Sequence, residues 1–330
     1  MNLDRIKKLP KVELHLHLDC SLSYDVVSSI DPSIDKRKYN SRFIAPSKCK
    51  DLADFLRCTT PGIGLMQTKK NLELVVDDLF RQLIDENVIY AEIRFAPLLH
   101  LEAGLHPEEV VEIVSAAVEK NIDLTGIKAG LILCTLRHYS EDESMRTVKL
   151  INKYIDSTPV CGFDLAADEA GFPIDAHVKS FRYAIDNNIP RTAHAGEARG
   201  AESVWETLRN LKPSRIGHGV RGIEDPKLIE YLIENSIHLE VCPTCNIQTN
   251  IYTYHANHPV DKLYKSGVSV GINTDARTLT NITLTGEYEK LMTSFGWNEE
   301  HFIRCNSNAL AHSFLPESDK SIIRFNVNWN

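Results

Sequence analysis

The chain has 330 residues, a formal net charge of −8 and 43% hydrophobic residues. This composition is that of an ordinary globular protein, and it excludes a disordered, collagen-like or disulfide-dense chain. An acidic chain has no general attraction for phosphate backbones, so we expect no nucleic-acid partner. No stretch approaches the ~20 apolar residues of a membrane helix, and the charged residues 1–19 do not match a signal peptide. We therefore expect a cytoplasmic protein with no membrane partner.

Short runs rich in Val, Ile and Leu alternate along the chain with amphipathic helical segments. We expect strands at 11–18, 88–96, 128–136, 160–166, 190–195, 214–218, 238–243 and 268–274. Among the helices, 71–86 has apolar residues at i, i+3, i+4 and i+7 spacing, with Asn71 as its expected N-cap. Another helix opens with Pro107 and runs over 107–119, and a third begins at Asp225-Pro226.

This alternation implies parallel strands joined by helical crossovers. Eight units without a linker predict one (β/α)8 TIM-type barrel over residues 1–330, with extra helices covering the C-terminal face. An open doubly wound sheet is the alternative, but its Gly-rich GxGxxG turn is absent.

Polar residues fall at the ends of several predicted strands. His15 and His17 share one strand face, with imidazoles roughly 6.5–7 Å apart along the strand, so both rings can reach one ion. By itself this pair also fits the polar face of an edge strand. His194, His218 and Asp275 end three other strands, and each could separately be a packing, turn or capping residue. Because strand ends meet at the C-terminal face of a barrel, a shared site explains them better. Three histidines and one carboxylate suit zinc, with a place left for water.

Eight motifs together resemble those of the adenosine deaminases, a branch of the metal-dependent amidohydrolases. They are KVELHLHLD (11–19), YAEIRFAP (90–97), LCTLRH (133–138), GFDLAADE (162–169), HAGE (194–197), RIGHG (215–219), EVCP (240–243) and NTD (273–275). The resemblance implies hydrolytic deamination of adenosine and 2′-deoxyadenosine to inosine and ammonia. It also implies one zinc ion per chain, bound by His15, His17, His194 and Asp275.

Further roles follow from the same resemblance. Glu197 would protonate purine N1, His218 would orient and polarise the attacking hydroxide, and Asp275 would take part in catalysis. The substrate, a small purine nucleoside, would also contact His17. Asp19 would contact the ribose 5′-hydroxyl, and the backbone N–H of Ala167, where the family usually has Gly, would face purine N3. Glu240 would lie behind His218 as its partner. An apolar lid over the base would comprise Leu52, Phe55 and Leu56.

The chemistry of this set is coherent without the family. Displacing an aromatic amine with water needs a nucleophile at neutral pH, and bound zinc lowers the pKa of water to about 7. Addition to C6 builds negative charge on the ring, so an acid is needed at N1. Glu197 is of the right type and follows His194 by three residues, so it can reach the centre without being a ligand.

Two positions depart from the family pattern. Ala276 stands where the family commonly has a second Asp that grips purine N7, and Cys20 replaces a Gly. Substrates such as N6-modified adenine nucleosides, aminodeoxyfutalosine or free adenine therefore stay open, although Asp19 has a role only if a ribose is present. A non-catalytic nucleoside-binding relative is a further alternative, but a binder needs no proton donor such as Glu197 beside a metal.

Other signals favour ordinary structural roles. Cys242 and Cys245 form a CxxC without a second pair, so we expect them to be core or strand-end cysteines. The cytidine deaminase signature has H-x-E, whereas the acid here lies at H-x-x-E. A two-metal hydrolase would need a bridging Lys after the fourth strand, where Asp164, Asp168 and Glu169 stand instead. Most of the remaining histidines, His258 among them, are expected at the surface or in packing.

Overall fold

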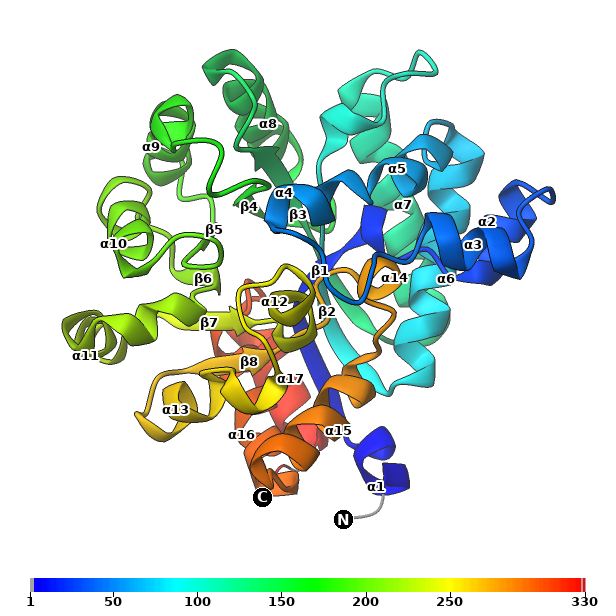
Figure 1. The fold of residues 1–330 in the computed structure, drawn as a ribbon. Helices are drawn as coiled ribbons and strands as arrows, with labels where there is room; N and C mark the ends of the chain where they lie inside the picture. The colour runs from blue at the N-terminus through cyan, green and yellow to red at the C-terminus, as the bar shows by residue number, and fades with distance from the viewer. Residues whose placement is uncertain (1–2, 328, 330) are drawn as a thin grey trace.

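The computed structural model describes residues 3–327 and 329, and parallel strands form its centre (Figure 1). The strands are β1 (Lys11–His17), β2 (Val88–Phe95), β3 (Lys128–Leu136), β4 (Val160–Ala166), β5 (Thr192–Ala195), β6 (Arg215–His218), β7 (His238–Val241) and β8 (Val270–Ile272). All eight predicted strands are confirmed, and each observed strand lies within its predicted range.

Two four-stranded sheets, ordered β1-β2-β3-β4 and β5-β6-β7-β8, make up the ring. At one seam Phe163 of β4, in the first sheet, pairs with Arg191, which immediately precedes β5 of the second sheet. At the other seam the His17 N–H donates to the Asp275 carbonyl oxygen at 2.8 Å, and the Asp275 N–H donates to the His15 carbonyl oxygen at 3.0 Å. The strands therefore close into the predicted barrel, and the second seam brings Asp275 beside both histidines of β1.

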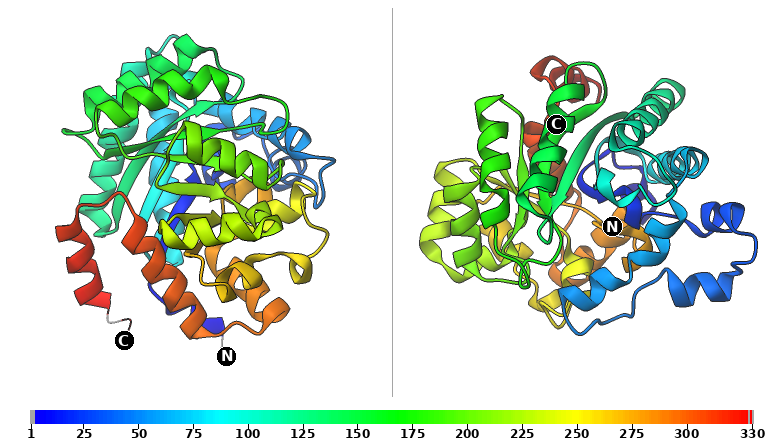
Figure 2. Two further views of the ribbon diagram at one scale, coloured as in Figure 1. Left: turned by 90° about the vertical axis from the view of Figure 1, so that its left-hand side faces the viewer. Right: turned by 90° about the horizontal axis from the view of Figure 1, so that it is seen from above.

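Helices surround the strands on their outer side in both views of Figure 2. The longer connections are α6 (Lys69–Asp85), α7 (Pro107–Thr125), α8 (Glu141–Tyr154), α9 (Val178–Asp186), α10 (Ala201–Asn210), α11 (Pro226–Glu234), α15 (Leu284–Phe295), α16 (Glu299–His312) and α17 (Glu317–Val327). Shorter helices are α1 (Leu3–Lys8), α2 (Tyr24–Ile30), α3 (Lys36–Arg42), α4 (Leu52–Arg57), α5 (Thr60–Leu65), α12 (Pro243–Gln248), α13 (Val260–Lys265) and α14 (Arg277–Thr280). Of these, α12 lies over the centre of the barrel and α4 over β3 in Figure 1, as expected for extra helices on that face.

The helix starts follow local capping chemistry, with one correction to the sequence analysis. Helix α11 begins at Pro226 as expected, and Asp225 caps it, because its side chain accepts from the Lys227 N–H. Asn71 was wrong as the N-cap of α6. Thr68 is the cap, and its hydroxyl accepts from the Asn71 N–H, because the helix begins earlier, at Lys69. The predicted apolar face of α6 is buried against the barrel.

Charged side chains fill part of the barrel interior, where branched apolar residues usually dominate. Arg94 contacts Asp164 at 3.1 Å and Glu240 at 2.7 Å, and Arg215 contacts Glu240 at 2.7 Å. Arg215 also pairs with Glu92, and all five side chains are fully buried. Buried charges are tolerated only when they are paired and hydrogen-bonded in this way. Through these ion pairs the network holds the carboxylates of Asp164 and Glu240 in place inside the barrel.

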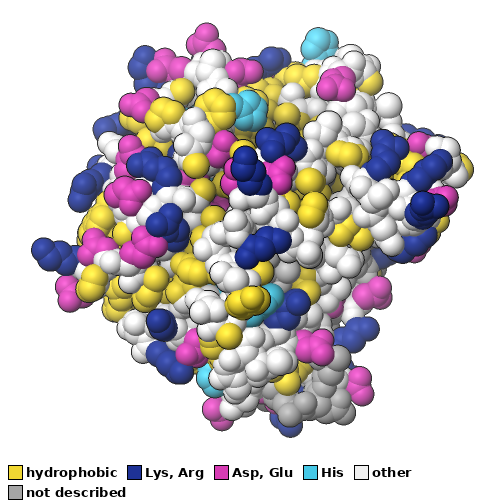
Figure 3. All heavy atoms as spheres, in the orientation of Figure 1, with side chains coloured by type: hydrophobic (Ala, Val, Ile, Leu, Met, Phe, Trp, Pro, Cys, Tyr) yellow, Lys and Arg dark blue, Asp and Glu magenta, His cyan; other side chains and the backbone are white. Residues whose placement is uncertain are grey.

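The surface shows no strongly one-sided charge on the face drawn in Figure 3, where Lys and Arg side chains are interspersed with Asp and Glu. Among the described residues, no helix is long and apolar enough to cross a membrane.

Candidate active site

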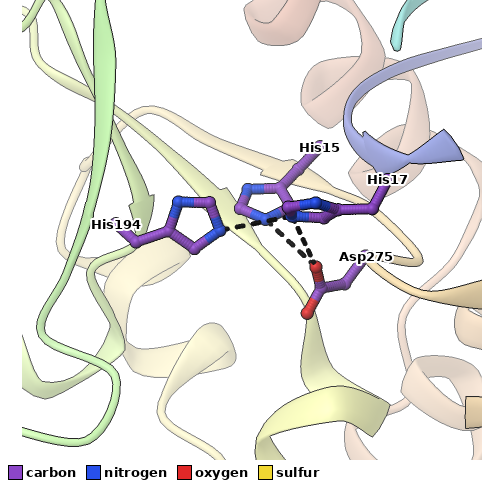
Figure 4. A group of neighbouring side chains, drawn as sticks. All are labelled: His15, His17, His194 and Asp275. Carbon is purple, nitrogen blue, oxygen red and sulfur yellow. Dashed lines mark hydrogen bonds and ion pairs between the residues drawn. The ribbon is translucent and has the colours of Figure 1, made fainter. Parts of the chain in front are cut away.

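Three imidazoles and one carboxylate converge at the C-terminal ends of the strands (Figure 4). His15 and His17 come from β1, His194 from β5, and Asp275 from the segment that follows β8. One ligand atom of each lies within 4.8 Å of the others. Asp275 Oδ1 is 3.2 Å from His15 Nε2 and 3.3 Å from His17 Nε2, and the Nε2 atoms of His17 and His194 are 3.4 Å apart.

Partners behind two of the rings set their tautomers. His15 Nδ1 is 2.9 Å from Glu240 Oε2, and His194 Nδ1 is 3.2 Å from Asp164 Oδ1. Burial opposes ionisation of Glu240, but Arg94 and Arg215 outweigh it and hold the pKa of this carboxyl well below its ordinary value. An ionised carboxylate only accepts hydrogen bonds, so Nδ1 carries the proton and Nε2 presents its lone pair.

The donor set fits a divalent metal. His15 Nε2 is buried and has no hydrogen-bond partner of suitable geometry among the described residues, although Asp275 lies beside it. Neutral imidazoles oriented by carboxylates, together with one carboxylate ligand, are the ligands that zinc takes in proteins. His15, His218, Cys242 and Asp275 form a second cluster. Burial raises the pKa of the Cys242 thiol, which donates to the Glu240 carbonyl oxygen, so this sulfur is poorly suited to bind a metal.

The predicted position of Glu240 behind His218 was wrong, because Glu240 lies behind His15. Inward-facing side chains of alternate strands share one layer of a barrel. Glu240 on β7 and His15 on β1 belong to such a set, whereas His218 ends β6. The partner of His218 is instead Asn246, whose amide nitrogen lies 3.1 Å from His218 Nδ1.

His218 and Glu197 lie together beside the four candidate metal ligands. His218 Nε2 is 3.5 Å from Glu197 Oε2 and 3.9 Å from Asp275 Oδ2. Burial, followed by the charges of Asp275 and Glu169, raises the pKa of Glu197 well above its ordinary value. This shift favours the protonated carboxyl, which is the form that can act as an acid.

Glu169 positions the loop that carries Glu197. Its carboxylate accepts hydrogen bonds from the backbone N–H groups of Gly196 at 2.7 Å, Glu197 at 3.0 Å and Arg199 at 2.9 Å. The sequence analysis gave no role to Glu169 or to Asp164. The signal available for Asp164 was a charged residue inside an apolar strand, and that for Glu169 was its place in a matched motif.

Two adjoining cavities open above these groups. The outer one, of about 360 Å³, is bordered by His17, Asp19, Cys20, Leu56 and Ala167, among others. The inner one, of about 50 Å³, shares four of these residues and reaches the deep part of the site, where it is bordered by Leu52, Phe55, His194, Glu197, His218, Asp275 and Ala276. Burial raises the pKa of Asp19 to about 6. Ala167 has a φ of 80°, a left-handed conformation that Gly adopts more easily. The structure thus brings the predicted site residues together. All of them except His15 and Glu240 border one of the two cavities, and Glu240 lies behind His15.

The comparison with known proteins agrees with this geometry. The family model for adenosine deaminase matches residues 10–328. The chain belongs to the adenosine deaminase family. An adenosine deaminase of Clostridium acetobutylicum is 36% identical over 328 residues, which cover 97% of this chain and 98% of that protein. One of Enterococcus faecalis is 33% identical, over 98% of this chain and 97% of that protein. Deaminases of this amidohydrolase branch depend on a metal, and the cluster of Figure 4 is the candidate site for it in this member.

Solved structures share the fold. An adenine deaminase from Arthrobacter aurescens has a TM-score of 0.89 at 24% identity, over 97% of this chain and 98% of that one. The N6-methyl-AMP deaminase from Arabidopsis thaliana has a TM-score of 0.87 at 22% identity, over 99% and 98%. An amidohydrolase from Burkhoderia ambifaria with bound Zn has a TM-score of 0.89 at 22% identity, over 99% and 91%.

Proposed function

We propose that this member of the family deaminates adenosine and 2′-deoxyadenosine to inosine and ammonia, with one zinc ion per chain and residues 1–330 forming a single catalytic domain. The observation that carries the proposal is the place of Glu197 and His218. They lie 3.5 Å apart at the inner end of a cavity, directly beside four convergent metal ligands. This combination supplies both a nucleophile and a proton donor to one bound molecule.

His15, His17, His194 and Asp275 would hold the zinc ion. When bound, zinc lowers the pKa of a water molecule to about 7 and so makes a nucleophile available at neutral pH. Asp275 Oδ2 and His218 Nε2 are 3.9 Å apart and would orient the attacking water between them.

Glu197 supplies the proton that the ring needs. As the water oxygen bonds to C6, negative charge builds on the purine, and the Glu197 carboxyl transfers its proton to N1. The proton of the new C6 hydroxyl then passes to the amine, the C6–N bond breaks, and ammonia leaves as the C6 carbonyl forms. The proton that the attacking water gave up restores the Glu197 carboxyl. Glu197 is 3% exposed, so this proton is shielded from bulk water.

The remaining pocket residues would bind the nucleoside. The outer cavity falls within the ~300–1,000 Å³ range of small-molecule sites. The Asp19 carboxylate would accept a hydrogen bond from the ribose 5′-hydroxyl, and the Ala167 N–H would face purine N3. Leu52, Phe55 and Leu56 on α4 border the inner cavity and would exclude water from the base.

The test is a substrate panel on the metal-loaded protein. It compares adenosine, 2′-deoxyadenosine, free adenine, N6-methyladenosine and aminodeoxyfutalosine by ammonia release and by loss of the adenine absorbance band. Adenosine and 2′-deoxyadenosine should give the highest kcat/KM. A clear preference for another member of the panel would overturn the proposed substrate.

Glu197→Gln tests the proton donor. The variant should keep its metal and fold but lose about 10²–10⁴-fold in kcat, the usual contribution of general acid catalysis. Metal content and the thermal unfolding midpoint serve as controls. Near-normal turnover would place the proton donor elsewhere.

A further inference from the structure

A chain of buried polar groups leads away from the active site behind His218. It runs from His218 through Asn246 to His258 and ends at the backbone of Val260. We propose that Asn246 and His258 are positioning residues that hold the proton of His218 on Nε2, so that His218 donates a hydrogen bond into the cavity. The catalytic meaning of this inference rests on the proposed function.

The direction of the chain is set at Val260. Its backbone N–H can only donate, and it donates to His258 Nδ1 at 3.2 Å. Burial, followed by the nearby His255, lowers the pKa of His258 to about 3, so its ring is neutral. A neutral imidazole that accepts at Nδ1 carries its single proton on Nε2.

That proton fixes the orientation of the Asn246 side chain. His258 Nε2 lies 3.1 Å from Asn246 Oδ1, so the amide oxygen faces His258 and the amide nitrogen faces His218. An amide NH₂ group only donates, and Nδ2 lies 3.1 Å from His218 Nδ1. His218 Nδ1 must accept, which leaves the proton of a neutral His218 ring on Nε2.

The surrounding structure holds the chain in place. The Asn246 N–H donates to the Cys242 carbonyl oxygen at 3.1 Å, and the Asn246 carbonyl oxygen accepts from the Tyr252 N–H at 3.2 Å. The Tyr252 ring packs edge-on against His258, with ring centroids 5.1 Å apart. Asn246 is fully buried and His258 is 2% exposed, so water does not compete for these hydrogen bonds.

Two other imidazoles of the site, His15 and His194, show the opposite arrangement. His15 and His194 face carboxylates at Nδ1, which places their protons there and turns the Nε2 lone pairs toward the metal position. An amide donor in the same place behind His218 gives a ring that donates from Nε2. For these three rings, the partner at Nδ1 therefore distinguishes the two metal ligands from the hydrogen-bond donor.

The consequence concerns the attacking oxygen. The Nε2–H of His218 faces the space beside Glu197 Oε2 and Asp275 Oδ2, at 3.5 and 3.9 Å. A donor aimed at this space stabilises negative charge on the attacking oxygen during addition to C6. In this tautomer Nε2 has no lone pair, so His218 neither binds the metal nor takes a proton from water in that step.

The tautomer can be measured directly in the metal-loaded protein. Two-bond ¹H–¹⁵N correlation spectra of protein labelled with ¹⁵N-histidine distinguish a protonated from an unprotonated ring nitrogen, and His218→Gln assigns the signals. We expect Nδ1 of His218 to be unprotonated and Nε2 to be protonated. A protonated Nδ1, a charged ring or a metal-bound Nε2 would overturn the proposal. This readout needs no substrate, so it separates the inference from the choice of adenosine.

His258→Leu and His258→Gln form a matched pair for the positioning role. Leu removes the donor to Asn246, whereas the Gln amide can replace it. We expect kcat to fall roughly tenfold to a hundredfold in His258→Leu, less than the ~10⁴-fold of a fully wrong tautomer in a serine protease triad. KM and metal content should change little, and His258→Gln should recover most of the loss. Equal losses in both variants would mean that His258 only fills space. If His258→Leu fails to fold, the spectra of the unsubstituted protein still decide.

Discussion

Position 276 offers no hydrogen-bond donor to a bound purine. By the resemblance to adenosine deaminases, this residue would face purine N7, and the family commonly has Asp here. The Ala276 N–H is already used, because it donates to the Thr274 carbonyl oxygen at 2.8 Å. Arg277 does not replace the missing group, since its guanidinium pairs with Glu13 at 2.5 Å inside the fold. Around Ala276 lies an apolar cluster of Cys20, Ala45, Cys49, Phe55, Cys242, Cys245 and Leu279.

This gap predicts how the pocket treats 7-deazaadenosine, which has a C–H group in place of N7. A hydrogen bond lost in a buried site costs about 1–3 kcal/mol, or ~5–150-fold in kcat/KM. If Ala276 leaves N7 without this bond, the protein should lose little kcat/KM with 7-deazaadenosine beyond the difference that the intrinsic reactivity of the two rings causes. Ala276→Asp and Ala276→Asn should then raise the preference for adenosine by ~5–150-fold. The new carboxyl would lie in the apolar cluster, which favours its protonated, donating form.

The assay measures kcat/KM for both nucleosides in the unsubstituted protein and in three variants. Ammonia release serves for both substrates, and their different ring reactivity cancels when the ratios are compared between proteins. Ala276→Val is the control, because it adds bulk without a donor. A ratio in Ala276→Asn within about threefold of the unsubstituted protein would refute the assignment, as would an equal rise in Ala276→Val.

Further predictions concern the metal, its partners and the pH dependence of stability. His15→Ala and His17→Ala should each abolish metal binding and activity, and elemental analysis showing full metal content in both would remove them from the ligand set. Glu240→Gln should weaken metal affinity about 10–100-fold, because His15 loses its ionised partner; an unchanged affinity in a metal titration would contradict this. Burial raises the pKa of Glu287 from 4.5 to about 7, so the folded state keeps a proton that the unfolded chain loses, and stability falls as pH rises between these values. Glu287→Gln should remove this slope and be ~3 kcal/mol more stable than the unsubstituted protein at about pH 8, which thermal unfolding at about pH 5 and pH 8 would test.

The strands and the convergence of the candidate metal ligands could be predicted from sequence because both depend on local patterns. Period-two alternation places His15 and His17 on one face, and parallel strands in a barrel bring their C-terminal ends together. Neither step requires knowledge of which strands are neighbours. The family resemblance then added roles that spacing alone did not give, such as that of Glu197.

The partners behind the rings could not be predicted in this way. Whether Glu240 supports His15 or His218 depends on how inward-facing residues of β1, β6 and β7 share layers inside the closed barrel. A sequence does not state those layers. Asn246 and His258 lie on the connection between β7 and β8. No periodic pattern there indicates which way a side chain points, so their position behind His218 is seen only in the folded structure. The sequence offered one indication of such partners: charged residues such as Arg94 and Glu240 stand within otherwise apolar strands, where a buried charge needs a partner.

Backbone conformation is the part of the site least visible in the sequence. Ala167, His218 and Asp275 have φ values of 80°, 60° and 62°, in the left-handed region that non-Gly residues seldom adopt. Such conformations cost on the order of 1–3 kcal/mol each and persist only where the surroundings determine them. Here the closed ring and its buried ion pairs supply that rigidity. Ala167 directly follows β4, His218 ends β6, and Asp275 lies at the seam of the barrel, where it pairs with Leu16 of β1. Both His218 and Asp275, on two different connections, combine a left-handed backbone with a side chain that borders the inner cavity. The strained backbone and the convergence of these groups therefore occur at the same positions.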